Sequence, residues 1–185
     1  TLPRSLHLTQ TGKGLRVRSQ LVDEVDQLVE ASTETVLLAS GDTIGLSALD
    51  NTGRLSALRY SFVVKGNSTS PVSLRFENEH DEFVDIQFDL QRSIVSVDRS
   101  ESGTTSFNDQ FGNLQKGVLT TTNDAFNVEV VIDRSSLELF IDNGTTVMTT
   151  LVFPETVYDM MRVGLDSPSL HQVSVERLGS VWASE

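Results

Sequence analysis

Apolar and polar residues alternate along most of this 185-residue chain. A period of two residues places one set of side chains on a buried face of a β-strand and the other set in water. Alternation over so much of the chain predicts an all-β protein. The clearest runs cover residues 6–9, 15–18, 58–62, 72–76, 83–90, 94–97, 127–133, 137–141 and 173–176.

Turn-forming residues separate these runs at short intervals. Such spacing is typical of short antiparallel strands joined by hairpins. We expect one domain over residues 1–185, built as a two-sheet antiparallel β-sandwich of about a dozen strands. The main turn signals are Gly12-Lys13-Gly14, Asn51-Thr52-Gly53, Gly66-Asn67-Ser68, Ser102-Gly103, Asn143-Gly144 and Ser167-Pro168.

Only residues 21–30 carry a helical pattern. The apolar residues recur there at spacings i, i+3, i+6 and i+7, at Val22, Val25, Leu28 and Val29. We expect at most one short helix, and an acidic extended crossing is an equal alternative for this segment.

The chain is acidic, with 26 Asp and Glu against 14 Lys and Arg, a formal net charge of −12. Such a surface repels phosphate backbones and anionic lipids, so we expect neither nucleic acid nor a membrane as partner. The chain has no cysteine. Disulfides, thiol nucleophiles and cysteine-based zinc sites are therefore excluded.

No catalytic or metal-binding motif is visible. The acidic run 77–82 lies between two alternating runs and lacks the glycine spacing of a calcium loop, so we interpret it as a solvated hairpin tip. His7, His80 and His171 are scattered without metal-ligand spacing. Among 26 acidic residues, no pair stands out for glycoside hydrolysis. We therefore expect no metal, no cofactor and no catalytic residue in this segment.

One short sequence pattern occurs twice. An apolar strand ends in Asp-Arg-Ser at residues 94–100 and again at residues 130–135. Asp and Ser side chains readily accept hydrogen bonds from turn N–H groups, and Arg can bind a carboxylate across the corner. We predict a structural turn motif at these two places. Its residues are Asp98, Arg99, Asp133, Arg134, Ser135 and Ser136.

Few aromatic residues are available to stack on sugars. Tyr60 alternates with core residues, Trp182 lies near the end of the sequence, and Tyr158 falls in an expected loop. A long stacking platform is therefore not expected, while a small polar pocket for one sugar stays open. Asn67-Ser68-Thr69 and Asn143-Gly144-Thr145 are glycosylation sequons at turn signals, where acceptors would be exposed.

Three blocks together resemble the C-terminal β-sandwich module of glycoside hydrolase family 32, which includes invertases, exo-inulinases and levanases. Residues 1–6 resemble its T-[LIV]-P-R-x-L start, and residues 97–103 its V-D-R-[ST]-x-S-G segment. Residues 131–140 are similar to its V-D-x-S-S-[VL]-E-[VL]-F strand pair, and the match continues through 151–154. Residues 20–25 lack the proline usual in the family, and residues 31–56 match no motif of it.

The resemblance implies a non-catalytic domain. Catalysis in the family belongs to an N-terminal five-bladed propeller, whose W-[ML]-N-D-P-N-G and R-D-P motifs are absent here. Residues 1–10 resemble the link from such a propeller. The implied partner is therefore the propeller of the same protein, which would hydrolyse sucrose, inulin or levan outside the cell. The implied roles are stabilising that domain, oligomer contacts and substrate access; the alternative is a carbohydrate-binding module for the terminal fructose of fructans.

Overall fold

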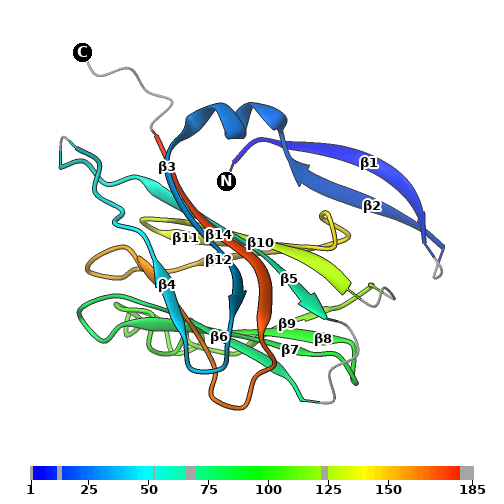
Figure 1. Ribbon diagram of the computed structural model, residues 1–185. Helices are drawn as coiled ribbons and strands as arrows, with labels where there is room; N and C mark the ends of the chain where they lie inside the picture. The colour runs from blue at the N-terminus through cyan, green and yellow to red at the C-terminus, as the bar shows by residue number, and fades with distance from the viewer. Residues whose placement is uncertain (1, 12–13, 52, 66–69, 122–124, 180–185) are drawn as a thin grey trace.

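Two antiparallel sheets face each other in the computed structural model of this chain (Figure 1). The structure describes residues 2–11, 14–51, 53–65, 70–121 and 125–179. The predicted all-β sandwich is confirmed, with six strands in each of the two sheets. Thr1, the Asn67 sequon and Trp182 lie outside the described residues.

The first sheet carries the features on which the functional argument depends. All its neighbouring strands are antiparallel. In spatial order the strands are β12 (Thr146–Leu151), β11 (Ser136–Ile141), β10 (Ala125–Asp133), β5 (Ala57–Lys65), β14 (Leu170–Leu178) and β3 (Val29–Leu38).

The second sheet packs against the inner face of the first. Its strands are also antiparallel throughout. In spatial order they are β4 (Thr43–Gly45), β13 (Met160–Val163), β6 (Val72–Glu77), β7 (Phe83–Asp89), β8 (Ile94–Asp98) and β9 (Gln115–Val118).

The core lies between the sheets and is built from the alternating apolar residues. Tyr60 of β5 is fully buried there and meets Phe76 of β6 edge to face, with ring centroids 5.1 Å apart. Tyr158 does lie in a loop, but it is also fully buried, and its hydroxyl donates to the carbonyl of Ser102 at 2.8 Å. Neither tyrosine is therefore available to stack on a sugar.

A separate two-stranded hairpin precedes the sandwich. It consists of β1 (Arg4–Thr11) and β2 (Gly14–Leu21), which pair only with each other and project from the sandwich in Figure 1. A six-residue 3₁₀ helix, η1 (Asp23–Leu28), then leads into β3. The expected short helix is thus confirmed, over residues 23–28 of the segment 21–30. Among the described residues this is the only helix, and it is far too short to cross a bilayer.

The strands without a clear alternating run are mostly sheet edges. β3, β12, β4 and β9 form the four edges of the two large sheets, and β13 is a four-residue inner strand. An edge strand buries less apolar side chain than a central one, so its sequence pattern is weaker. In β3 only Leu38 is buried.

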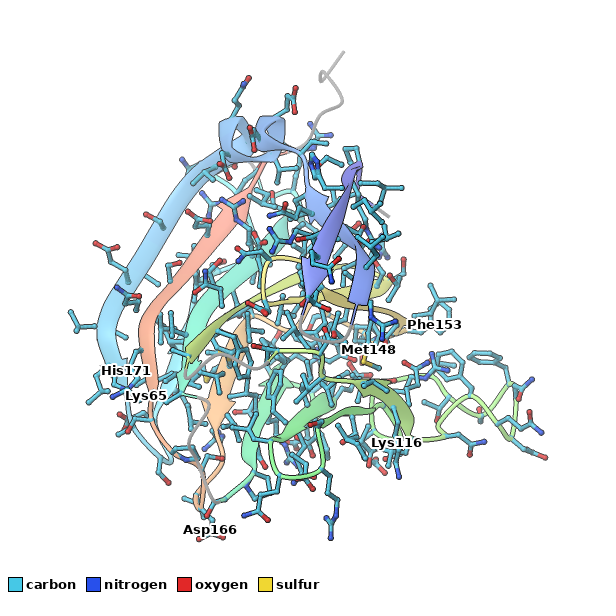
Figure 2. The ribbon with its side chains drawn as sticks, turned by 90° about the vertical axis from the view of Figure 1, so that its right-hand side faces the viewer. Lys65, Lys116, Met148, Phe153, Asp166 and His171 are labelled. Atoms are coloured by element: carbon cyan, nitrogen blue, oxygen red, sulfur yellow. The ribbon has the colours of Figure 1, made fainter. Side chains whose placement is uncertain are left out.

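Two of the family-like blocks meet beside β12. Gly103, which ends the block 97–103, forms a parallel β-bridge with Phe153, and the Thr104 N–H donates to the Phe153 carbonyl at 2.9 Å. Figure 2 shows Phe153 on the flank where the loop after β8 projects from the sandwich. Gly103 has φ +100°, and a Cβ added to it would lie 2.3 Å from the Phe153 oxygen. Glycine is therefore required here by both conformation and space.

We expect Gly103→Ala to destabilise the domain more than Gly53→Ala. Both residues have positive φ, where a side chain costs about 1–2 kcal/mol. At Gly53 no described atom lies within 4 Å of the added Cβ, whereas Gly103→Ala also overlaps backbone, and overpacking costs about 1–3 kcal/mol. Urea denaturation followed by far-UV circular dichroism should show that difference; equal losses in the two variants would contradict the packing argument.

Candidate functional site

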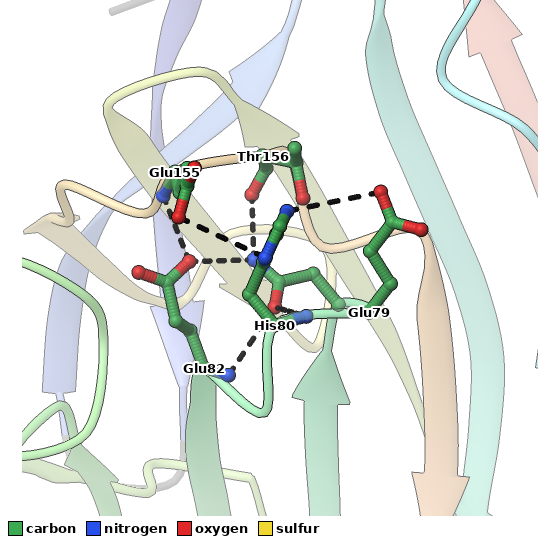
Figure 3. Close-up of polar contacts among 6 residues, drawn as sticks. Glu79, His80, Glu82, Glu155 and Thr156 are labelled. Carbon is green, nitrogen blue, oxygen red and sulfur yellow. Dashed lines mark hydrogen bonds and ion pairs between the residues drawn. The ribbon is translucent and has the colours of Figure 1, made fainter.

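The acidic run 77–82 forms the hairpin between β6 and β7, and Asn78 organises it (Figure 3). The Asn78 Oδ1 accepts from the N–H groups of His80 and Glu82, and its Nδ2 donates to Glu82 Oε2 at 2.7 Å. Glu82 Oε2 also accepts from the Glu155 N–H at 2.7 Å. These bonds join the hairpin to the segment before β13, so its polar groups serve the fold. No group of three or more His, Asp or Glu among the described residues is placed to hold a metal ion.

The two halves of the predicted turn motif lie in different sheets. Asp98 ends β8 in the second sheet, and its Oδ1 accepts from the Ser100 N–H at 3.0 Å. Asp133 ends β10 in the first sheet, and its Oδ1 accepts from the Arg134 N–H at 2.7 Å. Among the described residues, each aspartate side chain is therefore seen to accept a hydrogen bond within its own turn alone. The architectural role of the motif stays a prediction.

The other residues of the predicted turn motif differ in the contacts that they make. Arg99 donates to the Leu151 carbonyl at 2.9 Å and lies over the Phe111 ring, 3.9 Å from its centroid. Arg134 is exposed, and no carboxylate in the described part of the chain forms the expected ion pair with it. In the β10–β11 turn, the carbonyl of Ser135 accepts from the Val152 N–H at 3.1 Å, and Ser136 opens β11.

A cluster of phenylalanines, which the sequence did not predict, surrounds Arg99. Phe107, Phe111 and Phe153 have ring centroids 4.7–5.5 Å apart. The rings pack on one another and the Arg99 guanidinium lies over Phe111, while Phe107 stays 59% exposed and Phe153 38% exposed. The cluster holds the loop against β12.

The most elaborate polar arrangement lies on the outer face of the first sheet, around Arg59 of β5. Its Nη1 binds Asp26 Oδ1 of η1 at 2.6 Å, and its Nε binds Glu176 Oε2 of β14 at 2.6 Å. Glu129 of β10 lies 3.5 Å from the same Nη1. Burial opposes the charge on Arg59, but the hydrogen bonds that Arg59 donates to Glu176 and Asp26 outweigh it and raise the pKa of Arg59. The cluster ties η1 to two central strands.

Within this cluster, the surroundings of Glu129 disfavour its charged form. Burial raises the pKa of its carboxyl above the ordinary value, and the attraction of Arg59 only partly opposes that shift. The negative charges of Asp26 and Glu176 raise the pKa further. One cation thus faces three carboxylates that repel one another.

A second ion pair joins the start of the chain to β11. Glu138 is nearly buried, and its Oε2 accepts from Arg4 Nη2 at 2.6 Å while its Oε1 accepts from the Leu2 N–H at 3.1 Å. Arg4 also donates to Thr149 Oγ1 at 2.9 Å and lies 5.0 Å from the centre of the Phe140 ring. The first and third family-like blocks are therefore in direct contact. The signal in the sequence was a carboxylate within an apolar strand, which requires a partner when buried.

The far end of β2 is held at the turn between β11 and β12. The Ser19 N–H donates to the Gly144 carbonyl at 2.9 Å. Gly144 has φ +78°, and a Cβ added there would lie 1.9 Å from the Ser19 oxygen. The preceding Asn143, of the second sequon, is exposed on this turn. The close approach fixes the end of β2 against the turn between β11 and β12.

Residues 20–26 and the outer face of the first sheet border an open cleft of about 410 Å³. Its floor is the outer face of β5 and β10, and its walls are the end of β2, the start of η1, the turn at Asn143 and the start of β14. Its polar lining includes Gln20, Asp26, Arg59, Ser61, Asn127, Glu129 and Gln172.

Comparison with known families gives one match over most of the chain. Residues 23–177 match the family described as "Glycosyl hydrolases family 32 C terminal". The match begins after the β1–β2 hairpin and covers both large sheets.

Named relatives are similar at modest identity. The levanase of Bacillus subtilis (strain 168) is 25% identical over 156 residues, which are 84% of this chain and 23% of that protein. The extracellular exo-inulinase of Aspergillus awamori is 26% identical over 142 residues, 75% of this chain and 26% of that protein. The chain thus spans about a quarter of the length of the relatives it matches.

Solved structures share the fold. The exo-inulinase from Aspergillus awamori superimposes with a TM-score of 0.79 at 20% identity, over 98% of this chain and 36% of that one. A Bombyx mori GH32 β-fructofuranosidase superimposes with a TM-score of 0.73 at 17% identity, over 100% of this chain and 34% of that one.

We expect Arg4→Ala to lower the free energy of unfolding by about 2 kcal/mol. It removes a cationic partner of a nearly buried carboxylate, a change that costs about 3–5 kcal/mol in a fully buried pair, and Arg4 is 21% exposed. The control is Arg92→Ala, whose ion pair with Asp89 is on the surface and is worth less than about 1 kcal/mol. Chemical denaturation of both variants measures the difference, and equal effects would show that the Arg4–Glu138 contact is not structural.

We also expect Glu129→Gln to stabilise the domain at neutral pH. A folded pKa above the unfolded value means that Glu129 favours folding below about pH 4.5, and that this contribution is lost as the pH rises through the folded pKa. The stability of the variant relative to the wild type should therefore increase with pH above about 4.5. Denaturation curves between pH 4 and 8 test this, with exposed Glu34→Gln as control; a difference independent of pH would refute it.

Proposed function

The chain belongs to the glycoside hydrolase family 32 C-terminal domain family, and from this premise we propose that it is the non-catalytic β-sandwich of a secreted enzyme that hydrolyses fructans or sucrose. Its role is to dock on the N-terminal catalytic domain of the same protein and to stabilise it. The match over residues 23–177 supports the first part of this proposal. Secretion is supported by the Aspergillus relatives, which are named extracellular.

The observation that carries the docking role is the apolar face of the β1–β2 hairpin. Four apolar residues on one side of this two-stranded sheet are strongly exposed, and Leu8 and Val17 lie directly opposite each other. A two-stranded hairpin is marginally stable alone, and clustered apolar exposure marks an interaction surface. The exposed fractions are 68% for Leu6, 69% for Leu8, 62% for Leu15 and 60% for Val17.

The position of this surface favours the catalytic domain as its occupant. The chain enters through Leu2 and Arg4, which are anchored over β11 and lead directly into β1. The matched family is a C-terminal one, and the matched part is 23% of the levanase, so most of that relative precedes it. A preceding domain would therefore adjoin the hairpin, whose two strands pair with no other strand of the described structure.

The first test is the sequence encoded upstream of Thr1. We expect a five-bladed propeller carrying W-M-N-D-P-N-G there. In that longer protein, Leu8→Asp should lower the melting temperature and the fructan-hydrolysing activity left after heating, because a buried unpaired charge destabilises a contact.

The control places the same charge on an apolar residue away from the hairpin. Leu165 is 83% exposed in the loop between β13 and β14, so Leu165→Asp should leave both quantities unchanged. If Leu8→Asp also leaves them unchanged, the hairpin is not the docking surface.

A further inference from the structure

We propose that the β1–β2 hairpin docks through both of its faces, and that Arg16 and Arg18 on its second face bind carboxylates of the preceding catalytic domain. This inference rests on the proposed function, in which the apolar face of the same hairpin contacts that domain. Successive side chains of a strand point to opposite sides. In β2 the two arginines alternate with Leu15 and Val17, so they lie on the face opposite the apolar one.

The hairpin is basic, although the chain as a whole is acidic. Residues 1–22 include no Asp or Glu, whereas the whole chain has 26. On the second face, Arg18 lies directly across from His7, and Arg16 lies across from Thr9. Residues two positions apart in a strand are about 6–7 Å apart, so the two arginine charges repel each other. This face therefore has cations and no anion of its own.

Most other arginines of the described structure have a carboxylate partner, whereas Arg16 and Arg18 have none among the described residues. The arginines with a carboxylate within 4 Å are Arg4, Arg59, Arg75, Arg92, Arg162 and Arg177.

Arg18 also has a buried donor without an acceptor. Its side chain is only partly exposed, and its Nε is buried with no hydrogen-bond partner. Arg4, Arg99 and Arg177 have an unpartnered buried Nε as well, but in each of them another guanidinium nitrogen donates to a described acceptor. No guanidinium nitrogen of Arg18 does so among the described residues. An acceptor from outside this part of the chain would remove the cost of the buried donor.

A carboxylate-bearing protein surface fits this face better than a phosphate ligand. The planar guanidinium binds a carboxylate through two parallel hydrogen bonds. Arg16 and Arg18 are spread along one strand, which suits two separate carboxylates, whereas one phosphate requires donors that converge. The net charge of −12 repels larger polyanions. The catalytic domain that we propose to precede Thr1 would adjoin β1 directly, within reach of both faces of the hairpin.

The first test compares the double variant Arg16→Gln/Arg18→Gln in two proteins. In the longer protein that includes the catalytic domain, we expect the melting temperature to fall by about 2–4 °C at about 50 mM NaCl, because the ion pairs are lost. The deficit should shrink at about 1 M NaCl, where salt screens the wild-type pairs. In the 185-residue chain alone, the double variant should keep or raise the melting temperature, because only a repulsion is removed.

Two results would overturn the inference. A lower melting temperature in both proteins would mean that the arginines serve the fold of the sandwich. No change in the longer protein would mean that their face is not in contact. The control is Arg54→Gln, which should change neither protein. Arg54 is exposed in the loop between β4 and β5, and this loop lies on the opposite side of the sandwich from the hairpin (Figure 1).

Cross-linking of the longer protein identifies the partner. Arg18→Lys keeps the charge and supplies a primary amine, which a water-soluble carbodiimide joins to a neighbouring carboxylate as an amide. By mass spectrometry we expect the peptide that contains position 18 to be linked to an Asp or Glu of the catalytic domain. The control Arg54→Lys should give no link between the domains. Links from position 18 to carboxylates of the sandwich alone would overturn the inference.

Failure of this inference can be distinguished from failure of the proposed function. Leu8→Asp tests the apolar face, whereas the arginine variants test the second face. If Leu8→Asp destabilises the longer protein and the arginine variants do not, docking stands and only the second contact is refuted. If neither change has an effect, docking through the hairpin is refuted as a whole.

Discussion

Every strand of the sandwich can bury only one of its two faces in the core, and this constraint decides where all other features lie. The apolar faces of two six-stranded sheets meet and exclude water, which leaves the outer faces for charged and polar groups. The outer face of the first sheet is special because the N-terminal segment folds back over it. A second apolar cluster forms there, in which Val25 of η1 packs with Val131, Phe140 and Leu178.

Two ion-pair sites hold the covering segment in place. Arg59 attaches η1 to β14, and Glu138 attaches the start of β1 to β11. Both sites remove charges from water, so each gains stability only from close and complementary partners. The arrangement leaves a polar cleft beneath the covering segment and an apolar hairpin face above it. The N-terminal segment thus provides both the surface for which we propose domain docking and one wall of the polar cleft.

Contacts between distant segments explain what the family-like sequence blocks do in the fold. Arg4 of the first block binds Glu138 of the third, and Gly103 of the second lies against Phe153. Each pair is separated by at least fifty residues in the sequence and is adjacent only in the fold. The blocks therefore hold together segments that are distant in the sequence.

Alternation by itself determined the all-β class, the central strands and the inward position of Tyr60. Burial of one strand face produces an alternating pattern among residues that are neighbours in the sequence. Only the tertiary structure decided the edge strands, the burial of Tyr158 and the clusters around Arg59 and Glu138. An edge strand depends on what lies beside it, and a loop tyrosine is buried only if another loop covers it. The partners of a buried charge come from strands distant in the sequence, so no local pattern could identify Asp26, Glu129 and Glu176 as the neighbours of Arg59.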